Sequence, residues 1–518
     1  MEKQIAIIGA GISGLLACKC ILSKGFHPIV FESTSSIGGV WTSTCETTKL
    51  QNPKLGYQFS DFPWPDSVTE DFPTHDQVLD YIKAYAHHFD LLKHIKLDTK
   101  VIATQYEGPS DQEMHSWSLW NGNGEPFSSR GKWKVEVVNT KSLSTEIYQV
   151  DMVILCMGKF SGVPNIPEFP DRSKGPEAFH GKVVHSMDYA AMDNVSAAEL
   201  VKGKQVAIVG NQRSAMEIAM ECSAANGVKH PCTVLYKTEH WNIPDLFPWG
   251  VPLFFLYFNR FAELLIHKPG EGFLLSLLAT FLAPLRWVIS KFVESHIKRK
   301  LQLAKFGMVP RHSFLRELNS CQTTLVPEKF YDRVEEGSIV LKKAPSFGFC
   351  KEGIIVDGEN TPIKTDLVIL ATGYKGEEKL KDILVNQAFK DSILGSPKET
   401  VPLYRECIHP RIPQLAVIGF SEGASNLFLS EIRCRWLAEL LDGKFKLPSI
   451  QVMEKDVSKW SEYWKQASGP YYRKSCIGAI QIWYTDQLCK DMGWNPKRKK
   501  GLLAELLMPY GPMDYISP

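Results

Sequence analysis

This chain of 518 residues lacks several features that mark particular classes of protein. Its formal net charge is only +2, so there is no electrostatic case for a nucleic-acid partner. None of its 12 cysteines forms a CxxC pair, which predicts reduced thiols in a compartment facing the cytosol and no metal site. An apolar strand begins near residue 4, and we therefore expect no signal peptide before it.

The chain also lacks internal repeats and long low-complexity tracts. Hydrophobic residues make up 44% of the chain and charged residues 22%, which are ordinary values for a globular protein. The length is sufficient for two or three domains, each with its own hydrophobic core.

A glycine-rich turn directly follows the first predicted strand, Ile5–Ile8. The turn and the start of the next helix comprise Gly9, Ala10, Gly11, Ile12, Ser13 and Gly14. In a GxGxxG turn of this kind, the first glycine permits the tight turn, the second admits a pyrophosphate and the third lets the helix pack on the strand. The N-terminus of the helix then attracts the phosphates. The turn therefore predicts a dinucleotide site.

The second predicted strand ends at Glu32, at the spacing where a carboxylate binds a ribose hydroxyl. A carboxylate there disfavours a 2′-phosphate, so this site should hold FAD or NAD and not NADP. Gly38 and Gly39 follow, and such a pair permits close approach of the backbone to a ligand. We expect Gly39, Val40 and Trp41 to run along the pyrophosphate and ribityl portion of a long cofactor.

A second turn of the same type follows the apolar strand Val206–Val209. In this turn, glutamine replaces the middle glycine and alanine the last, and its residues are Gly210, Asn211, Gln212, Arg213, Ser214 and Ala215. The next predicted strand ends at Lys237, where a lysine suits a 2′-phosphate. The pattern predicts an NADP site. The alternative, suggested by Gln212, is that this half has lost its nucleotide and remains only as a scaffold.

Three further motifs accompany the two turns. Residues 61–64 read DFPW, residues 179–189 read FHGKVVHSMDY and residues 371–373 read ATG. With the two turns, they occur in the order found in flavin-containing monooxygenases and related N-hydroxylases, and the chain resembles this family from residue 9 to residue 374. Residues 49–53, KLQNP, resemble the plant branch of this family. Within that branch they favour the pathogen-defence group, which N-hydroxylates amines.

This resemblance implies an α/β fold with two Rossmann-like dinucleotide-binding domains and a largely helical C-terminal tail. It also implies that FAD and NADPH are both bound, with Thr372 and Gly373 among the cofactor contacts. NADPH would reduce the flavin, O₂ would add to it, and a flavin hydroperoxide would oxygenate a nucleophilic nitrogen or sulfur of a small amine or sulfide. The family's asparagine beside the flavin ring falls on Gln51 by a count without gaps, and Asn52 is its neighbour. We therefore assign the catalytic position to Gln51 and Asn52 jointly.

The positions of these motifs predict the domain boundaries. We expect the FAD-binding domain to begin with residues 1–165, the NADPH-binding domain to span residues 166–330, and the chain to return to the first domain over residues 331–430. Residues 415–419 are typical of a late strand of the first sheet, and the turn after it should approach the flavin end of the cofactor. Residues 431–518 should form a helical extension.

An apolar insertion spans residues 245–300 and is rich in Phe and Leu from residue 251 to residue 297. Its nearly uncharged run is shorter than the roughly 18–20 residues that a membrane span requires. Three interpretations stay open: a buried helical pair that covers the active site, an interfacial membrane helix, or a true span. We expect a cytoplasmic protein, which under the second interpretation lies peripherally on the endoplasmic reticulum membrane.

The sequence leaves three functions open. The first is the FAD- and NADPH-dependent monooxygenase, and the second is an NADPH-dependent flavin reductase acting on a disulfide or a quinone. A disulfide reductase should carry a CxxC pair, which the chain lacks. The third is a flavin-binding regulatory or scaffold protein with impaired NADPH use. The sequence leaves the substrate and the oligomeric state open.

Overall fold

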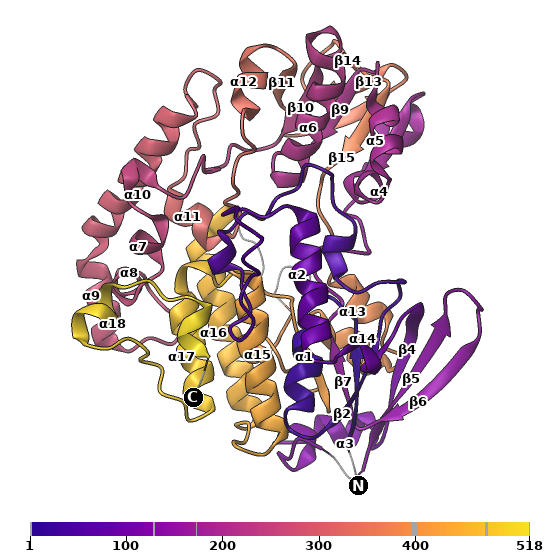
Figure 1. Cartoon of the computed structure of the whole chain (residues 1–518), viewed down its shortest axis with the longest axis vertical. Coiled ribbons are helices and arrows are strands. Elements are labelled where there is room, and N and C mark those ends of the chain that lie inside the picture. Colours follow the sequence, from indigo (N-terminus) through magenta and orange to yellow (C-terminus); the bar gives the residue numbers. More distant parts are fainter. Residues whose placement is uncertain (1–2, 128–129, 172–173, 396–400, 472–474, 517–518) are drawn as a thin grey trace.

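The computed structural model describes residues 3–127, 130–171, 174–395, 401–471 and 475–516. This described part contains two five-stranded parallel sheets, one in each lobe of the molecule (Figure 1). The first sheet has the order β16-β7-β1-β2-β3, and these strands span Leu415–Val417, Met152–Leu155, Gln4–Ile8, His27–Phe31 and Ile95–Lys96. Helix α1 (Ile12–Leu22) connects β1 to β2, as the first glycine-rich turn predicts. The position of β16 confirms the late strand expected at residues 415–419.

The second sheet has the order β11-β10-β9-β15-β8. These strands span Ile339–Lys343, Cys232–Tyr236, Val206–Val209, Leu367–Leu370 and Lys182–His185. Helix α6 (Arg213–Asn226) follows β9, as expected for the second turn. Because β11 and β15 belong to this sheet, the expected return to the first domain at residue 331 is wrong. The apolar pattern of a strand does not show which sheet the strand joins. The sequence pattern therefore did not predict that β11 and β15 pair within the second sheet.

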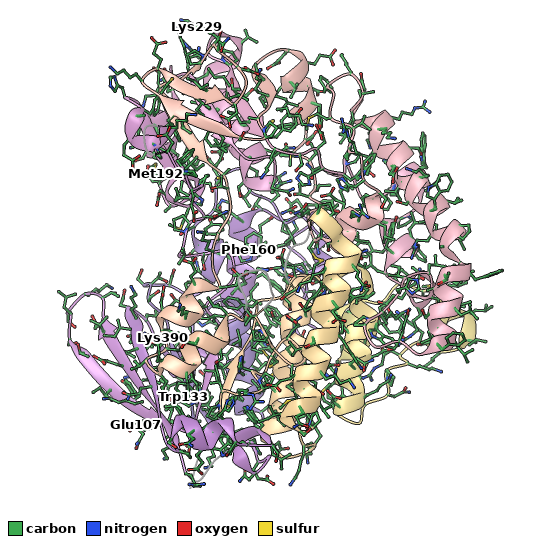
Figure 2. All side chains as sticks on the ribbon, turned by 180° about the vertical axis from the view of Figure 1, so that it is seen from behind. Glu107, Trp133, Phe160, Met192, Lys229 and Lys390 are labelled. Atoms are coloured by element: carbon green, nitrogen blue, oxygen red, sulfur yellow. A yellow bond between two sulfur atoms is a disulfide. The ribbon has the colours of Figure 1, made fainter. Side chains whose placement is uncertain are left out.

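Two small antiparallel sheets accompany the parallel ones. One has the order β4-β5-β6 (Thr99–Glu107, Lys132–Asn139, Thr145–Val150) and lies in the lower lobe, and the other has the order β12-β13-β14 (Phe347–Cys350, Gly353–Val356, Ile363–Lys364). Trp133 on β5 is fully buried beneath the first of them. Seen from behind, Phe160 lies where the lobes join, between the lobe that carries Lys229 and the lobe that carries Trp133 (Figure 2).

The C-terminal extension is helical, as expected. Its helices are α15 (Asn426–Leu441), α16 (Ile450–Ser468), α17 (Gln481–Asp491) and α18 (Leu502–Leu507). Helix α15 packs along α1 and extends the core of the first lobe (Figure 1). Trp436 and Trp464 are buried in this core, so the tail is part of the first lobe.

Short helices complete the two lobes. They are α2 (His75–His88), α3 (Asp111–His115), α4 (Ser186–Ala190), α5 (Asn194–Val201), α11 (Phe314–Asn319), α12 (Phe330–Glu335), α13 (Glu378–Asp382) and α14 (Gln387–Ile393).

The apolar insertion forms α7 (Leu253–Tyr257), α8 (Arg260–Leu264), α9 (Phe273–Phe281) and α10 (Ala283–Lys300). The side chains of Phe273, Leu274 and Phe281 are 79%, 78% and 79% exposed, so the first of the three interpretations, a buried helical pair, is wrong for α9. No single described helix is long and apolar enough to cross a membrane; only α9 and α10 taken together meet that test, and the pair is bent by 51°. Composition cannot tell whether an apolar helix is covered, because this depends on what packs against it.

Cys321 and Cys476 form a disulfide, with Cα atoms 5.6 Å apart. The expectation of reduced thiols is therefore wrong for this pair. The two cysteines are separated by 155 residues, so their spacing in the sequence gives no sign of the bond. The other ten cysteines are free, and nine of them are buried.

Candidate active site

The first glycine-rich turn brings β1 and α1 into direct contact. A Cβ added at Gly14 would lie 1.8 Å from the carbonyl oxygen of Gly9, and one added at Gly39 would lie 3.0 Å from the Cα of Gly11. The turn at residues 9–14 and the loop at residues 38–41 thus meet through glycine backbone alone. No side chain caps the N-terminus of α1, whereas Thr74 caps α2. An uncapped N-terminus beside such backbone fits a pyrophosphate.

Glu32 lies beside the first turn and binds its backbone. Its carboxylate is 8% exposed and accepts hydrogen bonds from the backbone N–H groups of Ala10, at 2.8 Å, and Thr34, at 3.0 Å. This places a buried carboxylate at the carboxyl end of β2, where a ribose would lie. Ile12 and Ser13 begin α1, and the Ser13 hydroxyl lies 3.2 Å from that of Ser430 on α15.

The loop after Glu32 is less buried than the turn. Val40 is 52% exposed, and the indole of Trp41 donates a hydrogen bond to the Tyr57 hydroxyl at 3.0 Å. Both residues belong to the 3₁₀ turn Gly39–Thr42, which faces Gly11. Val40 and Trp41 therefore lie beside the first glycine-rich turn, and their contact with a cofactor stays a prediction.

The second turn repeats the arrangement at the end of β9. A Cβ added at Gly210 would lie 2.4 Å from the carbonyl oxygen of Ala371, so only glycine fits there. No side chain caps α6, which Gln212 precedes. The side-chain nitrogens of Asn211 and Gln212 are buried and have no hydrogen-bond partner among the described residues. Because buried polar groups normally have partners, these nitrogens fit a bound dinucleotide.

The side chain of Arg213 is held by other groups of the protein. Its guanidinium donates to Glu217 and to the carbonyl oxygen of Leu325, both at 2.6 Å. Burial raises the pKa of the Glu217 carboxyl, while the Arg213 charge opposes that rise. Ser214 is exposed, and Ala215 is buried where α6 packs on β9. Arg213 thus ties α6 to the segment around residue 325.

Lys237 is exposed directly after β10, at the carboxyl end of the second sheet. No described residue forms an ion pair with it. Its position fits a 2′-phosphate on the ribose of a nucleotide held by the second turn.

Thr372 and Gly373 lie where the chain crosses between the lobes. Asn165 donates its backbone N–H to Gly373 at 2.9 Å and its side-chain amide to Thr372 at 3.0 Å, and the Thr372 hydroxyl donates back to Asn165. Lys379, just beyond, donates to the carbonyl oxygens of Met157 and Gly158, both at 2.7 Å. Burial lowers the pKa of Lys379 to about 8. The ATG motif therefore joins the two segments of the chain that cross between the lobes, around residue 165 and around residue 372.

Residues 47–52 bridge the two lobes, and Gln51 and Asn52 lie at the end of this segment. The Thr48 hydroxyl donates to Glu217 on α6 at 3.0 Å. The Gln51 amide oxygen accepts hydrogen bonds from the Thr324 hydroxyl and from the Leu325 N–H. Asn52 instead donates to the carbonyl oxygen of Ala424, in the turn after β16. The structure thus places the pair where the two lobes meet, with each member held by a different lobe.

Buried polar atoms without a described partner occur in the segments that hold this pair. They are Gln322 Oε1 and Thr323 Oγ1 on the side of Gln51, and Ser421 Oγ on the side of Asn52. A ligand between the lobes would complete their hydrogen bonds. The sequence patterns did not single out these three residues, because they lie in irregular segments that only the tertiary fold brings together.

A buried ion pair lies at the same edge of the first sheet. Lys159 Nζ and Glu422 Oε1 are 2.9 Å apart, and both side chains are 9% exposed. Lys159 follows β7 and Glu422 follows β16, which are neighbouring parallel strands. The pair holds the turn that carries Ala424, and no sequence pattern predicted it because its two members are far apart along the chain.

Comparison with known sequences assigns the chain to a family. The family described as "flavin-binding monooxygenase-like" matches residues 2–508 of this chain. The chain is 42% identical to probable flavin-containing monooxygenase 1 of Arabidopsis thaliana, over 99% of this chain and 96% of that protein. It is 26% identical to flavin-containing monooxygenase 1 of Homo sapiens, over 98% of this chain and 86% of that protein.

Solved structures share the fold. The S-allyl-L-cysteine S-oxygenase of Allium sativum matches with a TM-score of 0.59 at 18% identity, covering 96% of this chain and 89% of that chain. A steroid monooxygenase bound to NADP matches with a TM-score of 0.64 at 16% identity, covering 95% of this chain and 98% of that chain. The chain therefore belongs to the flavin-binding monooxygenase-like family and is an enzyme of the flavin-containing monooxygenase type.

Proposed function

We propose that the protein uses FAD and NADPH to insert one oxygen atom of O₂ into a nucleophilic nitrogen or sulfur of a small amine or sulfide. The observation that carries this proposal is that Gln51 and Asn52 are held by opposite lobes, each of which has an uncapped helix N-terminus at the end of a parallel strand. Buried polar atoms without a described partner occur in both segments that hold this pair. This arrangement suits two dinucleotides that exchange electrons.

The first turn, Glu32 and Gly39 would hold FAD, and the second turn with Lys237 would hold NADPH. Bound FAD, once reduced by NADPH, would supply the activation of O₂ and the transfer of one oxygen atom. The chain contributes orientation and exclusion of water. Ala424 orients the amide of Asn52, and Thr324 orients that of Gln51. Neither amide titrates, so the two residues position groups by hydrogen bonds and act as neither acid nor base.

A stopped-flow absorbance experiment tests this proposal. The purified yellow protein is mixed without oxygen with NADPH and then with O₂, and with a panel of small amines and sulfides. We expect rapid bleaching by NADPH, a long-lived new absorbance band in O₂, and oxygenated product. Bleaching by dithionite but not by NADPH would support the scaffold alternative, and fast transfer of electrons to a quinone without that band would support the reductase.

Replacing Lys237 with alanine is expected to raise the KM for NADPH about tenfold, because a charge-assisted contact to the 2′-phosphate is lost. The KM for NADH should change little. Lys229→Ala serves as the matched control, since Lys229 is also exposed in the second lobe but precedes β10. Equal changes for NADPH and NADH in Lys237→Ala would place the 2′-phosphate elsewhere.

We also propose that the protein rests peripherally on a lipid bilayer through α9 and α18. Leu502 and Leu503 on α18 are 82% and 73% exposed, like the apolar side chains of α9. Helix α8 contacts both α9 and α18, which lie beside each other in Figure 1. Lys497 and Lys500, just before α18, are exposed. Exposed aromatic and leucine side chains bordered by lysines suit a bilayer with anionic headgroups.

Sedimentation with phosphatidylcholine vesicles, with and without phosphatidylserine, tests this contact. The wild-type protein should bind the anionic vesicles, and replacing Phe273 and Phe281 with serine should weaken partitioning more than about tenfold, because each buried phenylalanine contributes about 1.5–3 kcal/mol. Ile147→Ser is the control, since Ile147 is 59% exposed on β6, which lies on the opposite side of the molecule from α9 and α18 (Figure 1). Equal partitioning of the two variants would contradict the proposed contact.

A further inference from the structure

The disulfide between Cys321 and Cys476 differs from the other cysteines of the chain. All 12 cysteines lie in the described part, and only these two are bonded. Burial raises the pKa of free thiols such as Cys18 and Cys20 to about 12, which keeps them protonated and unreactive. Apart from the partly exposed Cys350, thiol redox chemistry in the chain therefore centres on Cys321 and Cys476.

Cys321 begins the segment that holds Gln51. Three residues further on, the Thr324 hydroxyl and the Leu325 N–H donate to the Gln51 amide oxygen. The Leu325 carbonyl oxygen accepts from Arg213 on α6 at 2.6 Å. A displacement of Cys321 would therefore be transmitted to Gln51 and to the start of α6.

Cys476 lies beside the turn that holds Asn52. Its neighbours Ser475 and Ile477 pair with Glu422 through backbone hydrogen bonds of 2.9 and 2.8 Å. Two residues after Glu422, the Ala424 carbonyl oxygen accepts the hydrogen bond from Asn52. A displacement of Cys476 would therefore be transmitted to Asn52.

These contacts form a closed ring, in which the disulfide joins the two segments that separately hold Gln51 and Asn52. We propose that Cys321 and Cys476 are a redox-dependent positioning pair, whose bond sets the placement of Gln51 and Asn52 relative to each other. This inference rests on the proposed role of Gln51 and Asn52. Neither cysteine is a catalytic residue, since both act through the two amides.

The chemistry of opening and closing is a two-electron exchange. Cys321 is partly exposed whereas Cys476 is 3% exposed, so the thiolate of a dithiol reductant would attack Cys321 Sγ and Cys476 would leave and take up a proton. The second thiol of the reductant then releases Cys321 as a thiol, and the reductant becomes a disulfide. In the reverse direction, hydrogen peroxide oxidises Cys321 to a sulfenic acid with loss of one water, and Cys476 condenses with it to form the disulfide and a second water.

The experiment uses the flavin-loaded enzyme before and after treatment with dithiothreitol. Alkylation and mass mapping should show two additional thiols, at Cys321 and Cys476. The yield of product per NADPH consumed should fall about tenfold, because small displacements of positioning groups are costly, while the rate of flavin reduction by NADPH changes little. The absorbance and fluorescence of the bound flavin should also shift. Hydrogen peroxide, after removal of the reductant, should restore all of these properties.

Substitutions separate the outcomes. The double variant Cys321→Ser, Cys476→Ser should show the low yield from the start and should not respond to dithiothreitol, and Cys350→Ser, which removes a partly exposed free thiol, should behave as wild type. The inference is overturned if no bonded pair is mapped, or if the pair opens without change in yield or flavin spectrum. If Gln51→Ala and Asn52→Ala leave the yield intact, the proposed role of the amides fails; if they lower it while dithiothreitol does not, only the redox inference fails. Should the double variant not fold, the reversible treatment of the wild-type enzyme decides.

Discussion

Replacing Gly14 with alanine is expected to leave less than about a tenth of the protein with bound flavin. The added Cβ would lie 1.8 Å from the carbonyl oxygen of Gly9 and 2.9 Å from its carbonyl carbon. These are main-chain atoms, so no side chain can move aside, and α1 must shift away from β1. Overpacking of this kind costs about 1–3 kcal/mol or more, and the shift opens the pyrophosphate site at the start of α1. The flavin content is measured as the ratio of visible to ultraviolet absorbance.

The matched control for this substitution is Gly272→Ala. Gly272 precedes α9 with ordinary backbone angles, and a Cβ added there meets no atom within 4 Å. We expect this variant to bind flavin as the wild type does. A Gly14→Ala protein with normal flavin content would mean that α1 does not provide the cofactor site.

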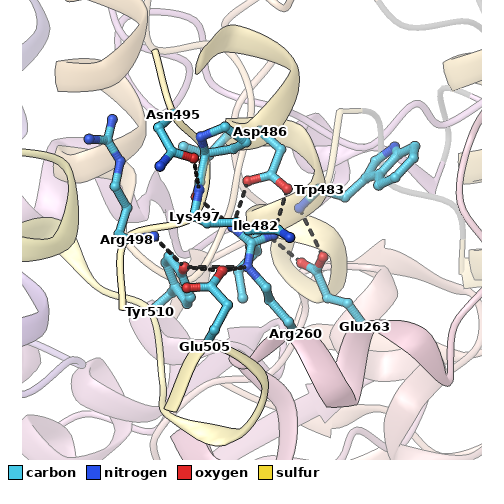
Figure 3. Close-up of polar contacts among 12 residues, drawn as sticks. Arg260, Glu263, Ile482, Trp483, Asp486, Asn495, Lys497, Arg498, Glu505 and Tyr510 are labelled. Carbon is cyan, nitrogen blue, oxygen red and sulfur yellow. Dashed lines mark hydrogen bonds and ion pairs between the residues drawn. The ribbon is translucent and has the colours of Figure 1, made fainter. Parts of the chain in front are cut away.

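Replacing Arg260 with alanine is expected to lower the free energy of unfolding by about 3–5 kcal/mol, because it leaves two buried carboxylates without their charged partner. The Arg260 guanidinium donates to both oxygens of Asp486, at 2.6 and 3.0 Å, and also binds Glu505 (Figure 3). Asp486 and Glu505 are only 8% and 7% exposed. Burial raises the pKa of Asp486 and Arg260 opposes that rise, so the variant should raise this pKa further.

Denaturant unfolding measures this loss, and two further variants calibrate it. Arg260→Lys keeps the charge but not the planar contact, so we expect a smaller loss of about 1–2 kcal/mol. Arg130→Ala removes a partner of Glu113 on the surface, where the Arg130 side chain is 64% exposed, and should cost less than about 1 kcal/mol. The contacts of Arg260 on α8 with Asp486 on α17 and Glu505 on α18 form a clamp between the three helices. If Arg260→Ala were as stable as Arg130→Ala, this clamp would not contribute to folding.

The contacts of Arg260 also link the apolar insertion to the C-terminal tail, which are the two parts of the proposed bilayer contact. Arg260 lies on α8, whereas Asp486 and Glu505 lie on α17 and α18. Glu263, one turn further on α8, accepts the backbone N–H groups of Ile482 and Trp483 at 2.7 and 2.9 Å (Figure 3). Loss of the clamp should therefore separate α18 from α9 and reduce vesicle binding even at temperatures where the core stays folded.

The amino-acid sequence by itself determined the two nucleotide turns. Strand, turn and helix follow one another within a few residues, and the steric demand on Gly14 comes from Gly9 in the same turn, whereas Gly9 and Gly210 are also confined by the distant Cys156 and Ala371. Glu32 and Lys237 directly follow β2 and β10. Since a residue that follows a parallel strand lies at the carboxyl edge of the sheet, the sequence predicts their place in the fold. The family resemblance rests on these local patterns, and the comparisons confirm it.

Only the tertiary structure decided the features that depend on distant segments. The assignment of β11 and β15 to the second sheet depends on strand pairing, and the bond between Cys321 and Cys476 depends on two loops that meet in space. The exposure of α9 depends on what packs against it. The partners of Gln51 and Asn52 come from segments far away along the chain, because an active site between two lobes is assembled by the fold and not by neighbouring residues.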